Sequence, residues 1–242
     1  MGPDPDHQRR TGRELIRTVQ SPNFGPRRGG ARPSMVILHY TAMADCAAAE
    51  RALCDPVREV SAHYLISENG VVTQLVAEQH RAWHAGQSRW GAIDDVNSHS
   101  IGIELSNTGF APFAAALMDS LEQLLAGILD RWSIPPERVL AHSDVAPGRK
   151  IDPGARFDWA RLARQGLVIQ LPKGGEQAVD DALFRSNLVA AGYADLPLET
   201  LLHAFRLRHR AGHAGALDTV DMALSAVLAD RYPVVDPNGE CA

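Results

Sequence analysis

The chain has 242 residues, a formal net charge of -5 and 45% hydrophobic residues, which suits one large globular domain or a large domain with a small one. No apolar run approaches the roughly 18 residues that a membrane-spanning helix needs, so we expect no integral membrane span. The mild acidity disfavours broad nucleic-acid binding, which requires a basic face, and we expect no nucleic-acid partner.

The N-terminal residues 1–34 are rich in Arg, Pro and Gly and predict an irregular arm. They contain no apolar segment of the kind that a secretory signal needs, and no early cysteine for lipid attachment. We therefore expect a cytoplasmic location, or a periplasmic or cell-envelope one if the N-terminus is trimmed. The odd number of cysteines (Cys46, Cys54 and Cys241) disfavours a disulfide framework.

Strand and helix signals begin after this arm. The apolar run Met35–His39 predicts a strand that ends on a polar residue, and the alanine-rich Cys46–Leu53 predicts a helix. The β-branched and apolar segments His63–Ser67 and Val71–Val76 predict a hairpin. Asn69-Gly70 lies between them and supplies the positive φ angles of a tight turn.

The elements continue through the middle of the chain. Residues 77–99 resemble a loop, and Ile101–Leu105 predicts a further strand. The helical spacing of apolar residues in Phe113–Trp132 predicts a long amphipathic helix. Val139–Ala141 predicts a short strand, and Asp158–Arg164 predicts a helix. Mixed strands and helices of this kind indicate an α/β or α+β domain with a mixed central sheet flanked by helices.

The composition changes near the Pro-Lys-Gly-Gly segment, which predicts a linker over residues 172–176 between a catalytic domain of residues 35–171 and a small domain of residues 177–235. Residues 236–242 form the expected tail. The first of three helices in the small domain is predicted over Gln177–Ala191. Apolar residues repeat at three- and four-residue steps in the other two, which predicts a three-helix bundle: Leu198, Leu201, Leu202, Phe205, Leu217, Val220, Leu224, Val227 and Leu228.

Three residues with metal-ligand chemistry lie at favourable backbone positions. His39 ends one predicted strand, His142 follows another, and Asp152 comes ten residues later in the same segment. Two neutral imidazoles and a carboxylate are a typical catalytic zinc set, which leaves a fourth position for water. On spacing alone, structural roles for the two histidines remain the alternative.

Two charged residues are candidate catalytic groups. Glu104 lies in a strand whose neighbours are small or apolar, so it is a candidate general base, the alternative being an outward-facing carboxylate. Lys150 lies two residues before Asp152, so in extended backbone both side chains point to one side. There its ammonium can stabilise an oxyanion, the alternative being a surface lysine paired with a nearby aspartate.

Several segments, in order, resemble the amidase-2 family of N-acetylmuramoyl-L-alanine amidases over roughly residues 18–170. They are H-Y-T-A, S-A-H-Y-L-I, W-H-A-G, S-I-G-I-E-L and H-S-D-V-A-P-G-R-K-I-D-P-G. The resemblance implies that His39, His142 and Asp152 bind one zinc ion per chain, and that Glu104 and Lys150 are catalytic. It implies zinc-dependent hydrolysis of the amide between N-acetylmuramic acid, or its 1,6-anhydro form, and L-alanine. The expected partners are peptidoglycan fragments or muropeptides, and a monomer is favoured.

Further implications of the resemblance concern substrate contacts and the C-terminal helices. Trp83 and His84 lie in a loop that resembles a substrate-facing loop of the family, and Asn107 and Thr108 are candidates to bond the stem peptide. The C-terminal helices resemble a peptidoglycan-binding module, although Arg206 stands where that module commonly has Gln. A packing domain is the alternative there. The alternative for the whole protein is a non-catalytic peptidoglycan- or muropeptide-binding protein on the same fold.

Overall fold

A computed structural model of the protein describes residues 16–172 and 174–234. At its centre lies a six-stranded mixed sheet with the spatial order β1-β5-β4-β7-β3-β8. β4, β7, β3 and β8 are mutually parallel, whereas β5 runs antiparallel to β4. The strands are β1 (Arg17–Thr18), β3 (Met35–Tyr40), β4 (Tyr64–Ile66), β5 (Val72–Gln74), β7 (Ser100–Leu105) and β8 (Val139–Ala141).

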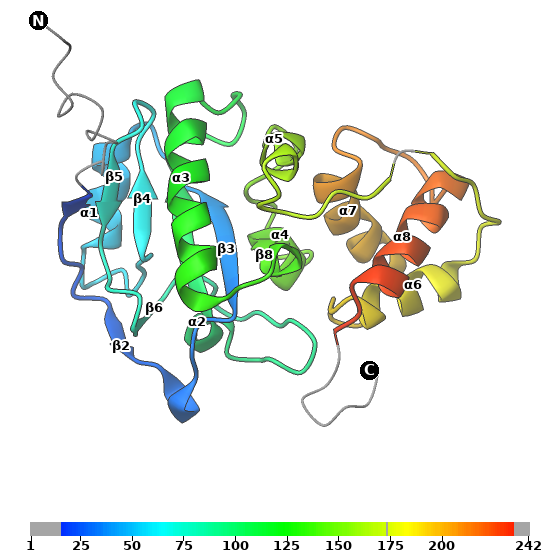
Figure 1. The fold of residues 1–242 in the computed structure, drawn as a ribbon, viewed down its shortest axis with the longest axis horizontal. Coiled ribbons are helices and arrows are strands. Elements are labelled where there is room, and N and C mark those ends of the chain that lie inside the picture. Colours follow the sequence, from blue (N-terminus) through cyan, green and yellow to red (C-terminus); the bar gives the residue numbers. More distant parts are fainter. Residues whose placement is uncertain (1–15, 173, 235–242) are drawn as a thin grey trace, which may run out of the picture.

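Helices flank this sheet, which confirms the predicted fold class. The long helix α3 lies across one face, and α4 and α5 lie between the sheet and three C-terminal helices (Figure 1). The first C-terminal helix begins at Asp181 rather than at Gln177, because the Asp180 carboxylate caps it by accepting from the Leu183 N–H. The helices are α1 (Cys46–Leu53), α2 (Val96–His99), α3 (Ala115–Trp132), α4 (His142–Val145), α5 (Trp159–Arg164), α6 (Asp181–Ala190), α7 (Leu198–His209) and α8 (Thr219–Arg231).

The expectation of an irregular N-terminal arm is wrong for the part of it that the structure describes. Strand β1 pairs with β5, and β2 (Phe24–Pro26) pairs with β6 (His80–Ala82) in a second, two-stranded sheet. The guanidinium of Arg27 ties this segment down by donating to four main-chain carbonyls, those of Glu78, Asn97, Ser98 and Ser100. Residues 1–15 of the arm and the expected tail 236–242 lie outside the described residues.

Alternation along the central strands decides which residues reach the functional face. In β3, Val36 and Leu38 join the apolar cluster under α3, whereas Met35 and Ile37 join a different cluster. His39 is therefore on the side away from α3. β7 follows the same rule, because Ile101, Ile103 and Leu105 pack under α3 and leave Ser100, Gly102 and Glu104 on the opposite side. The parallel register pairs His39 with Glu104.

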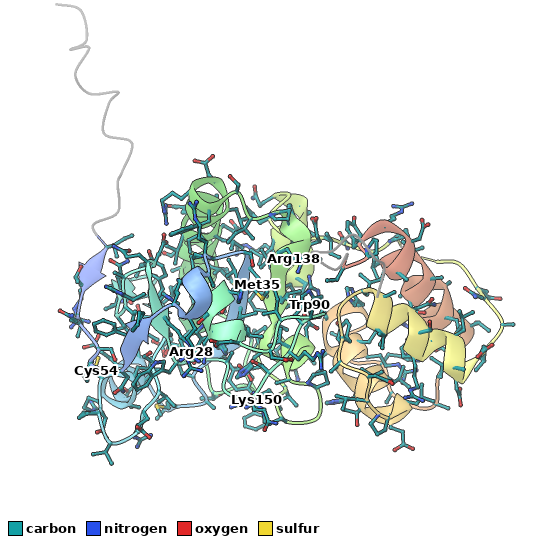
Figure 2. The ribbon with its side chains drawn as sticks, turned by 90° about the horizontal axis from the view of Figure 1, so that it is seen from below. Arg28, Met35, Cys54, Trp90, Arg138 and Lys150 are labelled. Atoms are coloured by element: carbon teal, nitrogen blue, oxygen red, sulfur yellow. The ribbon has the colours of Figure 1, made fainter. Side chains whose placement is uncertain are left out.

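The C-terminal helices share an apolar cluster with the sheet. Met35, Ile37 and Leu140 belong to the same buried cluster as Phe184 and Phe205 of the bundle. Trp90 lies at this junction (Figure 2), with its ring edge-on to that of Tyr193 at 5.1 Å between centroids. Within the described residues, no helix is long and apolar enough to cross a membrane.

Candidate active site

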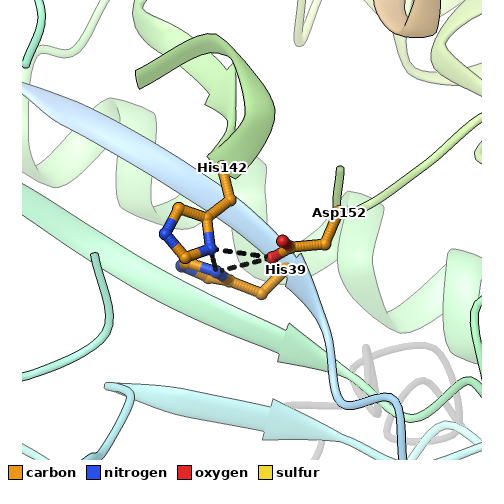
Figure 3. Close-up of side chains that lie close together, drawn as sticks. All are labelled: His39, His142 and Asp152. Carbon is orange, nitrogen blue, oxygen red and sulfur yellow. Dashed lines mark hydrogen bonds and ion pairs between the residues drawn. The ribbon is translucent and has the colours of Figure 1, made fainter. Parts of the chain in front are cut away.

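Three side chains converge at the carboxyl ends of β3 and β8. His39 is near the end of β3, His142 is the first residue of α4, directly after β8, and Asp152 lies in the following loop. The two Nδ1 atoms lie 2.9 Å apart, and each lies 2.9–3.0 Å from Asp152 Oδ2 (Figure 3). All three side chains are buried. The three predicted ligands are thus brought together, and as a group they can hold a metal ion.

The remaining contacts of His142 decide which of its nitrogens carries the proton. His142 Nε2 lies 3.1 Å from the main-chain carbonyl oxygen of Ala85, which can only accept. A proton on Nε2 satisfies this carbonyl and leaves the lone pair on Nδ1, which is the tautomer that a metal ligand requires. That lone pair points toward the Nδ1 of His39 and toward Asp152.

A longer chain of hydrogen bonds makes the same assignment for His39. The single hydroxyl proton of Ser100 is donated to the Val96 carbonyl at 2.6 Å, so Ser100 Oγ accepts from His84 Nε2 at 3.1 Å. The Nδ1 of the neutral His84 ring then accepts from His39 Nε2 at 3.0 Å. The Nδ1 of His39 is left unprotonated, facing the other two ligand atoms.

These assignments show that the three converging atoms fit a cation. With these tautomers, two nitrogen lone pairs and a carboxylate oxygen face one another at 2.9–3.0 Å. Burial lowers the pKa of His39 to about 4, assisted by the neighbouring His142, so the His39 ring is uncharged near neutral pH. A metal ion is the partner that these donor atoms suit.

Glu104 lies beside the three converging side chains, on the strand next to that of His39. Its register on β7 places it next to His39, and its Oε2 atom is buried with no hydrogen-bond partner among the described residues. Burial raises the pKa of Glu104 to about 8; the charge of Asp152 adds to this rise, and Lys150 opposes it. A raised pKa and a vacant acceptor atom are properties of a proton-transferring group.

A cleft of about 520 Å³ opens over these groups. The predicted catalytic pair Glu104 and Lys150 both line it, together with the three converging residues. One wall is apolar and is formed largely by α1 and the loops around it: Ala42, Met43, Ala49, Ala52, Leu53 and Val60. The cleft therefore combines a candidate metal-binding set, a candidate acid-base group and a cation with a surface suited to part of an organic substrate.

The predicted substrate residues divide into two groups. Trp83 and His84 line the cleft, and both ring nitrogens of His84 are hydrogen-bonded to His39 and Ser100. Asn107 and Thr108 are not among the lining residues. The Asn107 side chain donates to the Ala111 and Pro112 carbonyls and accepts from the Gly109 N–H, so it braces its own loop. Their roles toward a substrate stay predictions.

The sequence did not indicate the support behind His39. A Cβ atom on Gly102 would lie 2.4 Å from His84 Cγ, so this residue of β7 must be glycine for the His84 ring to reach His39. Behind His142, the Asp144 carboxylate accepts from the Ala141 N–H at 2.8 Å. The sequence signal for the packing of the His84 ring against β7 is the glycine inside the buried segment S-I-G-I-E-L.

The chain matches the family described as N-acetylmuramoyl-L-alanine amidase over residues 29–155. It is 35% identical over 234 residues to the N-acetylmuramoyl-L-alanine amidase AmiD of Escherichia coli, an alignment covering 83% of this chain and 84% of AmiD. It is also 35% identical to the 1,6-anhydro-N-acetylmuramyl-L-alanine amidase AmpD of Haemophilus influenzae, with 60% of this chain and 89% of AmpD covered.

Solved structures agree with this similarity. The complex of AmiD from E. coli with its substrate anhydro-N-acetylmuramic acid-L-Ala-D-γ-Glu-L-Lys aligns with a TM-score of 0.77 at 33% identity, covering 88% of this chain and 93% of that one. AmpDh3 from Pseudomonas aeruginosa in complex with anhydromuramic pentapeptide aligns with a TM-score of 0.76 at 31% identity, with 92% and 98% covered.

Proposed function

Because this chain belongs to the N-acetylmuramoyl-L-alanine amidase family, we propose that His39, His142 and Asp152 hold one zinc ion beside the base Glu104. The protein is an N-acetylmuramoyl-L-alanine amidase, a hydrolase of peptidoglycan-derived amides. The observation that carries the proposed site is the convergence of the His39, His142 and Asp152 ligand atoms next to Glu104, whose buried Oε2 atom has no hydrogen-bond partner among the described residues. Two imidazoles and a carboxylate are a donor set of catalytic zinc sites.

The chemistry divides between the metal and the side chains. A zinc ion held by His39, His142 and Asp152 would supply Lewis acidity and would lower the pKa of a water molecule. Glu104 takes the proton of the attacking water through its vacant Oε2 and then delivers it to the departing L-alanine nitrogen. The Lys150 ammonium stabilises the negative charge that develops on the amide oxygen. No covalent intermediate with the protein is needed.

We propose anhydro-muramyl peptides as substrates, since AmiD and AmpDh3 have each been solved with such a ligand. The cleft gives the chain its means of binding them. The apolar wall near Met43 and Leu53 suits the methyl groups of the lactyl and alanyl units, and the half-buried Trp83 side chain that lines the cleft suits the sugar ring. The bond cleaved is the amide between the lactyl carbonyl of muramic acid and L-alanine.

Digestion of defined substrates tests this function. Purified protein is incubated with anhydro-muramyl peptides and, separately, with intact sacculi, before and after metal removal by a chelator. We expect release of free stem peptide from the anhydro-muramyl peptides, loss of this activity on chelation, and recovery on adding zinc. Binding of muropeptides without any cleavage after zinc addition would instead favour the non-catalytic alternative, for which the unpartnered Glu104 carboxylate has no use.

We also propose that the chain divides into a catalytic domain and a small helical domain. Residues 35–171 carry every group named in the chemistry, residues 177–235 contain α6–α8, and residues 172–176 connect them. The three arginines near the end of α7 take part in internal ion pairs. Arg206 pairs with Asp221, Arg208 with Asp144, and Arg210 with both Asp218 and Asp221. These contacts support the packing role of the bundle over recognition of an anionic polymer by these arginines.

A further inference from the structure

The carboxylate of Asp144 is fully buried two residues beyond the ligand His142. It belongs to α4, the short helix that begins with His142. Its Oδ2 atom accepts from the Ala141 N–H at 2.8 Å, which stabilises the junction between β8 and α4. A buried charge is costly unless it is paired and fully hydrogen-bonded, so the other partners of Asp144 matter to the position of this junction.

Those partners come from the C-terminal bundle. Arg208 on α7 donates through Nη1 to Asp144 Oδ2 at 2.6 Å, and Tyr193, in the connection from α6 to α7, donates to Oδ1 at 2.8 Å. Both side chains are buried. Arg208 also donates through Nη2 to the Val139 carbonyl at 2.9 Å, and its guanidinium lies over the Trp159 ring at 4.7 Å.

The contacts hold the peptide on both sides of His142. The bundle bonds to Val139 at the start of β8 and to Asp144 in α4, and Asp144 in turn bonds to the main chain of Ala141. His142 lies between Val139 and Asp144. The direction of its Nδ1 lone pair therefore depends on the β8–α4 junction, which the bundle holds in place. Apolar packing of Leu140 and Val145 into the bundle cluster supports the same arrangement.

We propose that Arg208 and Tyr193 are positioning residues of the metal site, which make the bundle part of the amidase centre through Asp144. They touch neither a ligand atom nor the cleft, so their effect passes through the backbone of His142. The inference rests on the proposed metal site. The bundle would then do more than pack against the catalytic domain, because it would also raise the affinity of the metal site for its ion.

The same helix supplies a matched control. Arg206, two residues before Arg208, is equally buried and is paired with the buried Asp221. It also donates to the Gly215 and Ala216 carbonyls. Every one of these partners lies within the bundle. Arg206→Met therefore removes a buried arginine pair of the same kind without touching the β8–α4 junction, and Asp221 keeps Arg210 as a partner.

The test compares zinc affinity with stability for three full-length variants: Arg208→Met, Tyr193→Phe and Arg206→Met. Zinc affinity is measured by competition with a chromogenic chelator, and the unfolding midpoint is measured on zinc-free protein. Removing partners that orient a ligand typically costs about 10–100-fold in metal affinity, and we expect a loss of that size for Arg208→Met. Tyr193→Phe removes one hydroxyl, so it should fold and show a smaller loss. Arg206→Met should lower the midpoint and keep wild-type zinc affinity.

The outcomes separate this inference from the proposed function. If the wild-type protein binds no zinc, the metal site itself is wrong. If the wild type binds zinc and Tyr193→Phe and Arg208→Met bind it as tightly as the wild type, the positioning role is overturned. Equal losses of zinc affinity in Arg206→Met and Arg208→Met would also overturn it, because the effect would then follow general destabilisation of the bundle.

Discussion

Replacing Glu104 with glutamine should change stability and activity in opposite directions. Glutamine keeps the size and one carbonyl oxygen of the side chain, but it carries no charge and takes up no proton. The buried Oε2 atom of Glu104 has no hydrogen-bond partner among the described residues. Its ionised form is therefore unfavourable in the folded protein without metal, and the variant removes that cost.

The pKa of Glu104 sets the size of the stability change. Burial, the first cause of the shift, raises the pKa from 4.5 to about 8 in the folded protein. Between these values the folded state holds a proton that the unfolded state has released, so stability falls as pH rises through this window. Each pKa unit corresponds to about 1.4 kcal/mol. Allowing for relaxation around a partly exposed side chain, Glu104→Gln should gain about 2–4 kcal/mol more at pH 8 than at pH 5.

Urea unfolding of chelator-treated wild type and Glu104→Gln at pH 5 and pH 8 measures this difference. The comparison across pH cancels the contributions of all groups that titrate equally in both proteins, including the histidines. In parallel, the zinc-loaded variant should keep its metal and lose about 10²–10⁴-fold in turnover, the usual contribution of a positioned acid-base group. Parallel stability changes in both proteins from pH 5 to pH 8, or near-normal turnover, would refute the assigned environment and role of Glu104.

Three other substitutions separate the parts of the site. Gly102→Ala places a methyl group 2.4 Å from His84 Cγ, so chelator competition should show zinc affinity about 10-fold weaker; unchanged affinity would contradict the His84 contact as a support of His39. Lys150→Ala should lower kcat by about 10²–10³-fold with zinc content unchanged in metal analysis, whereas an unaltered kcat would exclude oxyanion stabilisation. Asp152→Ala should lose zinc itself on dialysis, and retention of one zinc per chain would exclude it as a ligand.

Much of the candidate site could be predicted from the sequence because it lies on regular elements. The apolar runs before His39 and His142 identify β3 and β8, and strand alternation is enough to put Glu104 and His39 on one face once the register is known. The N-terminal segment was not predictable in the same way. Its short strands β1 and β2 form only because β5 and β6 offer edges to them, and a two- or three-residue strand leaves no periodic pattern.

The supports of the two histidines were beyond prediction for a different reason. His84 reaches His39 across 45 residues of chain, and Arg208 reaches Asp144 across 64. No sequence-spacing rule relates the two residues of either pair. Each contact depends on how loops and helices pack against the sheet. The sequence therefore does not show that the arginines near the end of α7 pair with buried or partly buried aspartates.

The most direct test of the account is anomalous diffraction at the zinc edge from crystals of the purified, zinc-loaded protein. The account predicts one zinc per chain, bonded at about 2.0–2.2 Å to the Nδ1 atoms of His39 and His142 and to a carboxylate oxygen of Asp152. Zinc bonded through the Nε2 atoms would contradict the proton assignments made from His84, Ser100 and Ala85. A crystal with no zinc between these three residues would contradict the central claim.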